Sequence, residues 1–229
     1  MGELPPLFDK SIECLLCKQP ATTKKIRSRF IKVAEYDTDF CPKYAEGTTN
    51  GLFYNIHVCP KCGFAFSKEF SKYFAPGTKE EISEKICSHW VPHSFSDERT
   101  INDAIQTYKL ACYSAILKKE KHITIAGLYL RTAWLYRLKQ NEEQEHRFMR
   151  LARHEYEESF SIGDYTGTQV SEVRILYLGG ELSRRIGELQ TATKYFSMVL
   201  EKRKSAVETS IIQMARDRWT DIKGELPAH

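Results

Sequence analysis

Two pairs of cysteines mark the first third of the chain, and each pair has the C-x-x-C spacing. Cys14 and Cys17 lie in ECLLCKQP, and Cys59 and Cys62 lie in HVCPKCGF. Each pair can form a tight turn that directs both sulfurs to one point, and two such turns supply the four ligands of a closed tetrahedral zinc site. Gly63 suits this geometry, since the residue after the second cysteine often needs a positive φ. The spacing therefore predicts a structural Zn²⁺ bound by these four cysteines.

The segment between the two pairs is 41 residues long, and its composition predicts strands. The stretch RSRFIKVAEYDTDF alternates in part and is rich in β-branched and aromatic residues, and GLFYNIHV leads directly into the second pair. CPKYAEGTTNG supplies turn residues between them. We expect a small antiparallel, zinc-ribbon-like β module over residues 1–75.

Redox chemistry is the main alternative for the C-x-x-C pairs. A thioredoxin-like site needs one pair at a helix start within a βαβ pattern, and the sequence lacks that pattern. A catalytic zinc keeps one position open for water, whereas four thiolates close it. We therefore do not expect chemistry at the metal itself.

The chain is expected to be cytoplasmic. Its first ten residues, MGELPPLFDK, have neither the basic start nor the apolar core of a secretory signal. In that reducing compartment the seven cysteines would be thiols or metal ligands, not disulfides. The longest apolar runs are far shorter than the roughly 20 residues of a membrane span, so no membrane partner is expected.

A polar cluster in the same third of the chain could form an active site. It consists of Asp37, Asp39, Cys41 and His57, the first three within DTDFCP. The acids could bind an ion, and the thiol and imidazole could act as nucleophile and base. Turn hydrogen bonds from the acids and a small buried thiol explain the same residues structurally.

Basic residues follow the first cysteine pair and offer a nucleic-acid interpretation. They are Lys18, Lys24, Lys25, Arg27, Arg29 and Lys32. With Phe30 and Tyr36 they could contact phosphates and stack a base, or they could form a solvated strand face. The formal net charge of the chain is only +4, well below that of a dedicated nucleic-acid binder.

The remaining two thirds of the chain predict helices. Thr78 and Glu81 have capping-box spacing and predict a short helix to about Cys87, within a linker at residues 76–96. From residue 97 to 229 the apolar residues recur with helical periodicity and predict six helices in three antiparallel pairs. Cys87 and Cys112 lie on apolar faces, where we expect core thiols. The expected fold class is α+β, mainly α.

One of the helix pairs carries a repeat pattern. In LYLGGELSRRIGELQTATKYF, the positions of Leu176, Gly180, Gly187, Ala192 and Phe196 resemble a tetratricopeptide repeat. Small residues let the two helices approach closely, and the aromatic ring fills the remaining space. Ser183 and Lys204 depart from the usual aromatic residue and proline, and a plain helical bundle is the alternative. Three pairs satisfy the minimum for a repeat stack, so we expect tetratricopeptide-like hairpins.

The order of these motifs resembles a bacterial family catalogued as number 2225 among the domains of unknown function. The resemblance rests on both C-x-x-C pairs, the D-x-D-F-C-P stretch at 37–42, the C-P-x-C-G plus aromatic stretch at 59–64, and the helices that follow. It covers nearly the whole chain and implies a cytoplasmic bacterial protein. It implies no activity and no catalytic residue.

Three functions remain open from the sequence. The first is a non-enzymatic scaffold or regulator that binds a protein or peptide in a groove of the helical repeats. The second is a nucleic-acid-binding regulator that acts through the basic zinc ribbon. The third is a hydrolase or transferase built around Asp37, Asp39 and His57.

Overall fold

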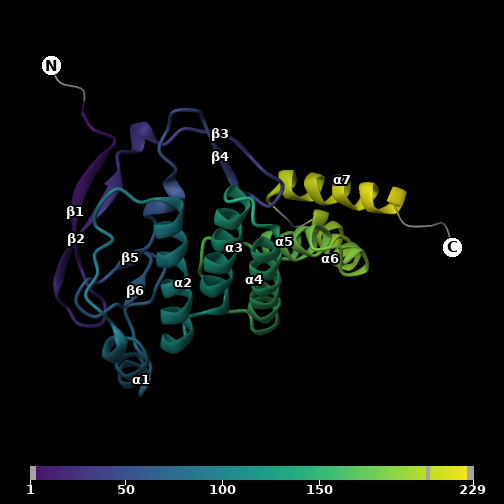
Figure 1. The fold of residues 1–229 in the computed structure, drawn as a ribbon. Coiled ribbons are helices and arrows are strands. Elements are labelled where there is room, and N and C mark those ends of the chain that lie inside the picture. Colours follow the sequence, from purple (N-terminus) through teal and green to yellow (C-terminus); the bar gives the residue numbers. More distant parts are fainter. Residues whose placement is uncertain (1–3, 205–206, 226–229) are drawn as a thin grey trace. The chain divides into compact units, whose positions relative to one another are not determined.

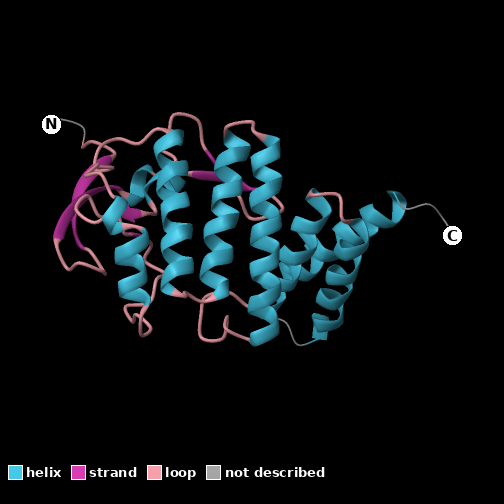
Figure 2. Cartoon of the chain, turned by 60° about the horizontal axis from the view of Figure 1, so that its bottom comes forward, coloured by secondary structure: helices cyan, strands magenta, loops and turns pink. Residues whose placement is uncertain are grey.

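The structure is a computed structural model that describes residues 4–204 and 207–225. Six short strands lie in the N-terminal third: β1 (Leu7–Glu13), β2 (Pro20–Ile26), β3 (Val33–Tyr36), β4 (Pro42–Tyr44), β5 (His57–Val58) and β6 (Ala65–Phe66). The α-helices follow: α1 (Thr78–Lys85), α2 (Ile101–Lys118), α3 (His122–Leu138), α4 (Glu142–Ile162), α5 (Glu172–Arg185), α6 (Leu189–Glu201) and α7 (Thr209–Glu225). Helices therefore dominate, and the predicted α+β, mainly α class is confirmed (Figures 1 and 2).

The strands form three separate antiparallel sheets of two strands each: β1 with β2, β3 with β4, and β5 with β6. Each pair is a hairpin in sequence order, as expected for strands joined by short turns. In the described part of the chain no helix is long and apolar enough to cross a bilayer.

The chain divides into two compact units. The first unit takes the described residues up to Tyr36, Pro42–Glu120 and Trp134–Asn141. The second takes Asp37–Cys41, Lys121–Ala133 and the described residues from Glu142 onwards. These units differ from the boundaries expected at residues 75 and 97, because α2 packs against β5, β6 and α1 and so belongs to the first unit.

Helix α2 supplies the apolar wall of the first unit. It begins at a complete capping box, in which Thr100 accepts from the Asp103 N–H and the Asp103 carboxylate accepts from Thr100. Its Tyr108, Ala111 and Ala115 are fully buried. The predicted capping box at Thr78 is wrong, because that hydroxyl donates to the Ala75 carbonyl and Gly77 precedes the helix.

A buried arginine holds the loops of the first unit to one another. Arg99 is 5% exposed, and its guanidinium donates to the carbonyls of Phe53 (2.8 Å), Ile56 (2.9 Å) and Phe95 (3.0 Å). Backbone carbonyls thus take the place of a carboxylate partner for this buried charge. Burial lowers the pKa of Arg99.

The sequence placed the strands only in part. GLFY, expected to be extended, forms a 3₁₀ turn (Gly51–Tyr54), because the Asn50 side chain accepts from the Leu52 N–H and caps it. Within RSRFIKVAEYDTDF only β3 is a strand, and residues 37–41 form a turn. The longest hairpin, β1 with β2, was not predicted.

Helix α5 is the centre of the second unit and is buried from Val173 to Ser183, apart from the half-buried Arg174. It packs against α4, α6 and α7. A Cβ atom on Gly180 would lie 2.7 Å from the Phe196 ring of α6, which explains the glycine at this position. Gly187, with φ of +82°, makes the turn between α5 and α6. The expected small residue and turn glycine are therefore both in place.

Substitution of Gly180 by Ala is expected to destabilise the second unit by about 2–3 kcal/mol, since the added methyl group forces α5 and Phe196 apart. The matched control is Gly224→Ala on α7, where a Cβ meets nothing within 4 Å. Its expected effect is a gain of about 0.5–1 kcal/mol from the better helix former. Chemical denaturation of both variants measures the difference, and equal free energies of unfolding would contradict the close contact.

Candidate metal centre and the Asp37–Cys41 loop

The two C-x-x-C pairs form the turns of two different hairpins and have the same backbone geometry. The first joins β1 to β2 and the second joins β5 to β6. In the first, the Cys14 N–H donates to the Gln19 carbonyl and its carbonyl accepts from Lys18. In the second, Cys59 makes the equivalent bonds with Phe64 and Gly63. Each turn therefore presents two sulfurs from a rigid, hydrogen-bonded frame.

The four sulfurs converge on one point. All four Sγ atoms lie within 4.8 Å of one another, and the Cys14–Cys62 and Cys17–Cys59 separations are both 3.7 Å. A tetrahedral ion with metal–sulfur bonds of about 2.3 Å requires sulfurs about 3.8 Å apart. Disulfide sulfurs are about 2.05 Å apart, so the four are thiols and not two bridges. The cluster could thus hold a metal ion, as the spacing predicted.

The negative charge that the four cysteines carry when they lose their protons also favours the binding of a cation. A hydrogen bond from Cys62 lowers the pKa of Cys14 to about 5, against burial, which raises it. The same bond raises the pKa of Cys62, and burial raises the pKa of Cys59. One thiolate therefore forms readily, whereas further ionisation places like charges within 4.8 Å of one another. A divalent ion offsets that repulsion, so its binding would release protons.

A tryptophan covers the second turn. Trp90, in the segment after α1, donates from Nε1 to the Pro60 carbonyl at 2.9 Å. Its ring lies over Gly63, where a Cβ atom would come within 2.5 Å of ring carbons. Gly63 has the expected positive φ of +74°, and Lys18 takes the equivalent position in the first turn with φ of +60°. The ring thus limits solvent access beside Cys62, which strengthens electrostatic interactions there.

Substitution of Gly63 by Ala is expected to cost about 3 kcal/mol, because a positive φ and the contact with Trp90 both oppose a side chain. Lys18→Ala is the matched control, since its φ is also positive but a side chain is already present there. Thermal unfolding of the two variants tests this. A loss for Lys18→Ala as large as that for Gly63→Ala would contradict the role of the ring.

The other cysteines lie outside the four-sulfur cluster. Cys112 is buried on α2, as expected for a core thiol. Cys87 is only half-buried, so it is less enclosed than expected. Burial raises the pKa of Cys87, and a hydrogen bond with Cys62 opposes that shift.

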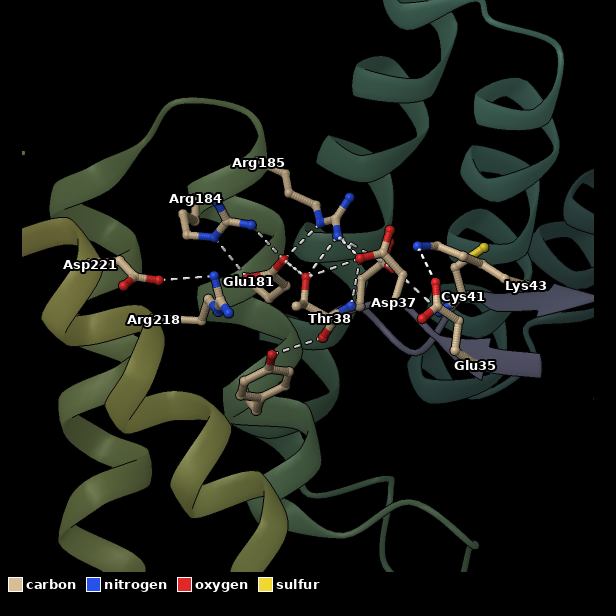
Figure 3. Close-up of polar contacts among 12 residues, drawn as sticks. Glu35, Asp37, Thr38, Cys41, Lys43, Glu181, Arg184, Arg185, Arg218 and Asp221 are labelled. Atoms are coloured by element: carbon tan, nitrogen blue, oxygen red, sulfur yellow. Dashed lines mark hydrogen bonds and ion pairs between the residues drawn. The ribbon is translucent and has the colours of Figure 1, made fainter. Parts of the chain in front are cut away.

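The loop Asp37–Cys41, between β3 and β4, belongs to the second unit and contacts α5 (Figure 3). Thr38 donates to the buried carboxylate of Glu181, and its carbonyl accepts from the Tyr177 hydroxyl at 2.8 Å. Phe40 packs against Tyr177 with ring centroids 5.5 Å apart. The Arg174 guanidinium lies 4.4 Å from the Phe40 ring centroid. Polar and apolar parts of the loop therefore both contact α5.

One arginine links the three acidic residues of this cluster. Arg185 lies 2.7 Å from Asp37, 2.7 Å from Glu181 and 3.9 Å from Asp39. Asp39 and Glu181 are fully buried, so the guanidinium offsets charges that water does not reach. Burial raises the pKa of Glu181, but hydrogen bonds from Arg184 and Thr38 and the two arginine charges outweigh it, and the net pKa is lowered. Glu181 is therefore a buried carboxylate that stays ionised.

The predicted Asp37, Asp39, Cys41 and His57 cluster is divided between the units. Asp37 and Asp39 belong to the second unit, where they pair with Arg185, and Cys41 is buried there with its N–H bonded to Asp39. His57 belongs to the first unit, on β5. Burial lowers the pKa of His57 to about 4, with nearby lysines and Arg99 adding to the effect. The imidazole is therefore neutral at physiological pH, and it does not belong to the same unit as the two acids that pair with Arg185.

Some of the basic residues after the first cysteine pair already interact with acidic or aromatic side chains. Lys24 pairs with Asp9 at 2.6 Å, and Lys18 lies 3.7 Å from Glu13. The Arg27 guanidinium stacks on Phe8 at 4.9 Å. The cluster is thus not one uniform cationic face.

Sequence reasoning missed Glu181, Arg184, Arg185 and Trp90. An acid and an arginine pair at 181–185 on a helix is ordinary for a solvated face, and only burial distinguishes them. A signal for Trp90 was present in Gly63, since a glycine at a fixed turn can also mark close approach of a ring.

Comparison with curated proteins finds no match, and comparison with solved structures finds none either. Comparison with protein families matches residues 7–222, which span both cysteine pairs, the Asp37–Cys41 loop and α1 to α6 together with most of α7. The chain therefore belongs to the bacterial family described as "Uncharacterized protein conserved in bacteria (DUF2225)".

Proposed function

We propose that this chain is a cytoplasmic zinc-binding protein without catalytic chemistry of its own, which acts as a scaffold or regulator by binding a protein or peptide. The observation that carries the zinc assignment is the convergence of four sulfurs from two equivalent hairpin turns. Such a set leaves no open coordination position, which is the property of a structural site. Four thiols also require the reducing conditions of the cytoplasm.

The binding role rests on the second unit. The Gly180 and Phe196 contact and the Gly187 turn are consistent with a tetratricopeptide-like hairpin formed by α5 and α6. The two acids of the alternative active site, Asp37 and Asp39, both pair with Arg185. A stack of helix pairs is a common way to present an extended binding surface.

Metal content tests the zinc assignment. Purified wild-type chain is expected to carry close to one zinc per chain, and Cys59→Ser is expected to carry almost none. The matched control is Cys112→Ala, which removes a thiol outside the cluster and should leave the zinc content unchanged. Iron in place of zinc, or equal metal in all three proteins, would contradict the assignment.

Affinity capture from the native cell tests the binding role, and the intact chain is the right reagent. A fragment that starts near residue 97 would expose the buried face of α2, which packs in the first unit. A specific partner should be retained by the intact chain and lost in Gly180→Ala, which disturbs the α5 and α6 hairpin, but kept in Gly224→Ala. Retention of no protein, or equal retention by both variants, would count against the scaffold.

A further inference from the structure

The first unit contains a pocket whose lining residues belong neither to the four-cysteine cluster nor to the α-helices. Its volume is 480 Å³, within the range of about 300–1,000 Å³ of small-ligand sites. Its lining includes Arg29, Phe30, Lys32, Glu46 and Thr49. All of these residues belong to the first unit, and none is a ligand of the metal centre.

Among the residues that the structure describes, the cations of this pocket have no anionic partner. Within residues 4–204 and 207–225, neither Arg29 nor Lys32 forms an ion pair, and the Arg29 guanidinium only stacks on Phe30 at 4.7 Å. Other lysines nearby differ in this respect, since Lys24 pairs with Asp9 and Lys43 with Glu35. Two unpaired cations at one concave site favour an anionic ligand, and a guanidinium can bind phosphate through two parallel hydrogen bonds.

The turn at residues 47–49 also lines the pocket and adds hydrogen-bond donors. Gly47, with φ of +72°, makes the turn closed by the Thr48 N–H and the Ala45 carbonyl. The Gly47 N–H, the Thr49 N–H and the Thr49 hydroxyl have no hydrogen-bond partner among the residues that the structure describes. Backbone N–H groups at a glycine turn can donate to phosphate oxygens.

The remaining lining residues match the other parts of a nucleotide. The Phe30 ring is half-buried, and an aromatic ring at such a site can stack a base. Glu46 is exposed at the same pocket, where its carboxylate can accept from ribose hydroxyls. A bare phosphate would leave both unused.

We propose that this pocket binds a nucleotide, with Arg29 and Lys32 on the phosphate, the Phe30 ring under the base, and Glu46 on the ribose. The site is independent of the proposed scaffold role, because it uses no residue of the second unit. The nucleotide can be free or one unit of a single strand. A second arginine and aromatic pair, Arg27 on Phe8, lies close by, since the Arg27 N–H donates to the carbonyl of the lining residue Pro6.

Isothermal titration of the intact, metal-loaded chain with adenosine 5′-monophosphate tests the proposal. Saturable binding is expected, with inorganic phosphate at least about tenfold weaker. The double variant Arg29→Ala, Lys32→Ala should bind at least about tenfold more weakly than wild type, since it removes both charged donors to the phosphate. The control is Lys68→Ala, Lys72→Ala, which removes the same charge from exposed positions outside the pocket and should bind as wild type does.

A six-residue oligoadenylate distinguishes the two sources of nucleotide. Tighter binding than the monophosphate, with an affinity that falls steeply as salt rises, assigns the site to a single strand. Equal affinity per site assigns it to a free nucleotide. Absence of saturable binding for every probe, equal loss in both double variants, or phosphate as strong as the monophosphate would each overturn the proposal.

Discussion

Removal of the metal is expected to unfold the first unit and leave the second folded. Structural zinc in small domains contributes about 10–16 kcal/mol, as much as the whole stability of a typical domain. At the second turn the strand pairing of the hairpin could not replace the zinc, because β5 and β6 contain only two residues each and two-stranded hairpins are marginal in water. Chelation, or Cys59→Ser, should therefore release both hairpins.

Hydrogen exchange resolves this prediction by region. Amides of β1, β2 and residues 57–66 are expected to lose protection by orders of magnitude after chelation. Amides of α5 and α6 serve as the internal control, since they lie in the other compact unit. Unchanged protection of the two hairpins, with all four thiols free to react, would show that the metal does not organise this unit.

Substitution of Arg185 by Met has the second largest expected effect, a loss of about 3–5 kcal/mol in the second unit. The change removes one of the two guanidinium groups that face the buried Glu181 and the guanidinium beside Asp37 and the buried Asp39, and breaking a buried ion pair by removing one partner is strongly destabilising. Arg216→Met is the matched control, because Arg216 is exposed on α7 and its guanidinium donates to Gln213. Chemical denaturation measures both, and a small loss for Arg185→Met would mean that the acids are satisfied without it.

The pH dependence of stability provides a separate test of the same network. The folded-state pKa of Glu181 is lowered, so its contribution is fully present above the unfolded value of about 4.5 and is lost as the pH falls through the folded value. The groups that face it are Thr38, Arg184, Arg185 and, through Arg185, Asp37. Wild type should therefore lose more stability between pH 6 and pH 3 than Glu181→Gln. Parallel pH profiles would contradict a lowered pKa.

The four-cysteine cluster could be predicted because its signal is local. The C-x-x-C spacing itself encodes the turn, and Gly63 marks its left-handed residue. In the first turn the left-handed residue could not be recognised from the sequence, because Lys18 takes the positive φ that glycine usually takes. The hairpin of β1 and β2 was not predicted. Its residues are mostly exposed or half-buried, so its sequence lacks the apolar alternation that indicates a strand.

The Asp37–Cys41 loop could not be placed from the sequence, because its partners lie far along the chain. Arg185 is 148 positions from Asp37, and Tyr177 is 139 positions from Thr38. Short-range pattern rules contain no information on such pairs. The acids therefore suggested an active site, whereas the structure pairs them with the α5 arginine.

The helices of the second unit could be predicted from the sequence, since helical periodicity repeats over many residues and tolerates single exceptions. The apolar positions of α4, α5 and α6 were predicted, and so was the close contact at Gly180. The exception is Val207, an apolar residue within the range of the predicted helices, which precedes α7 and is 95% exposed.

Zinc-edge X-ray absorption on the purified chain tests the central claim most directly, because it counts the sulfur atoms bound to the ion. Coordination by Cys14, Cys17, Cys59 and Cys62 predicts four sulfur neighbours at about 2.3 Å and no nitrogen or oxygen. A first coordination shell with fewer than four sulfurs, or one completed by water or histidine, would contradict the account.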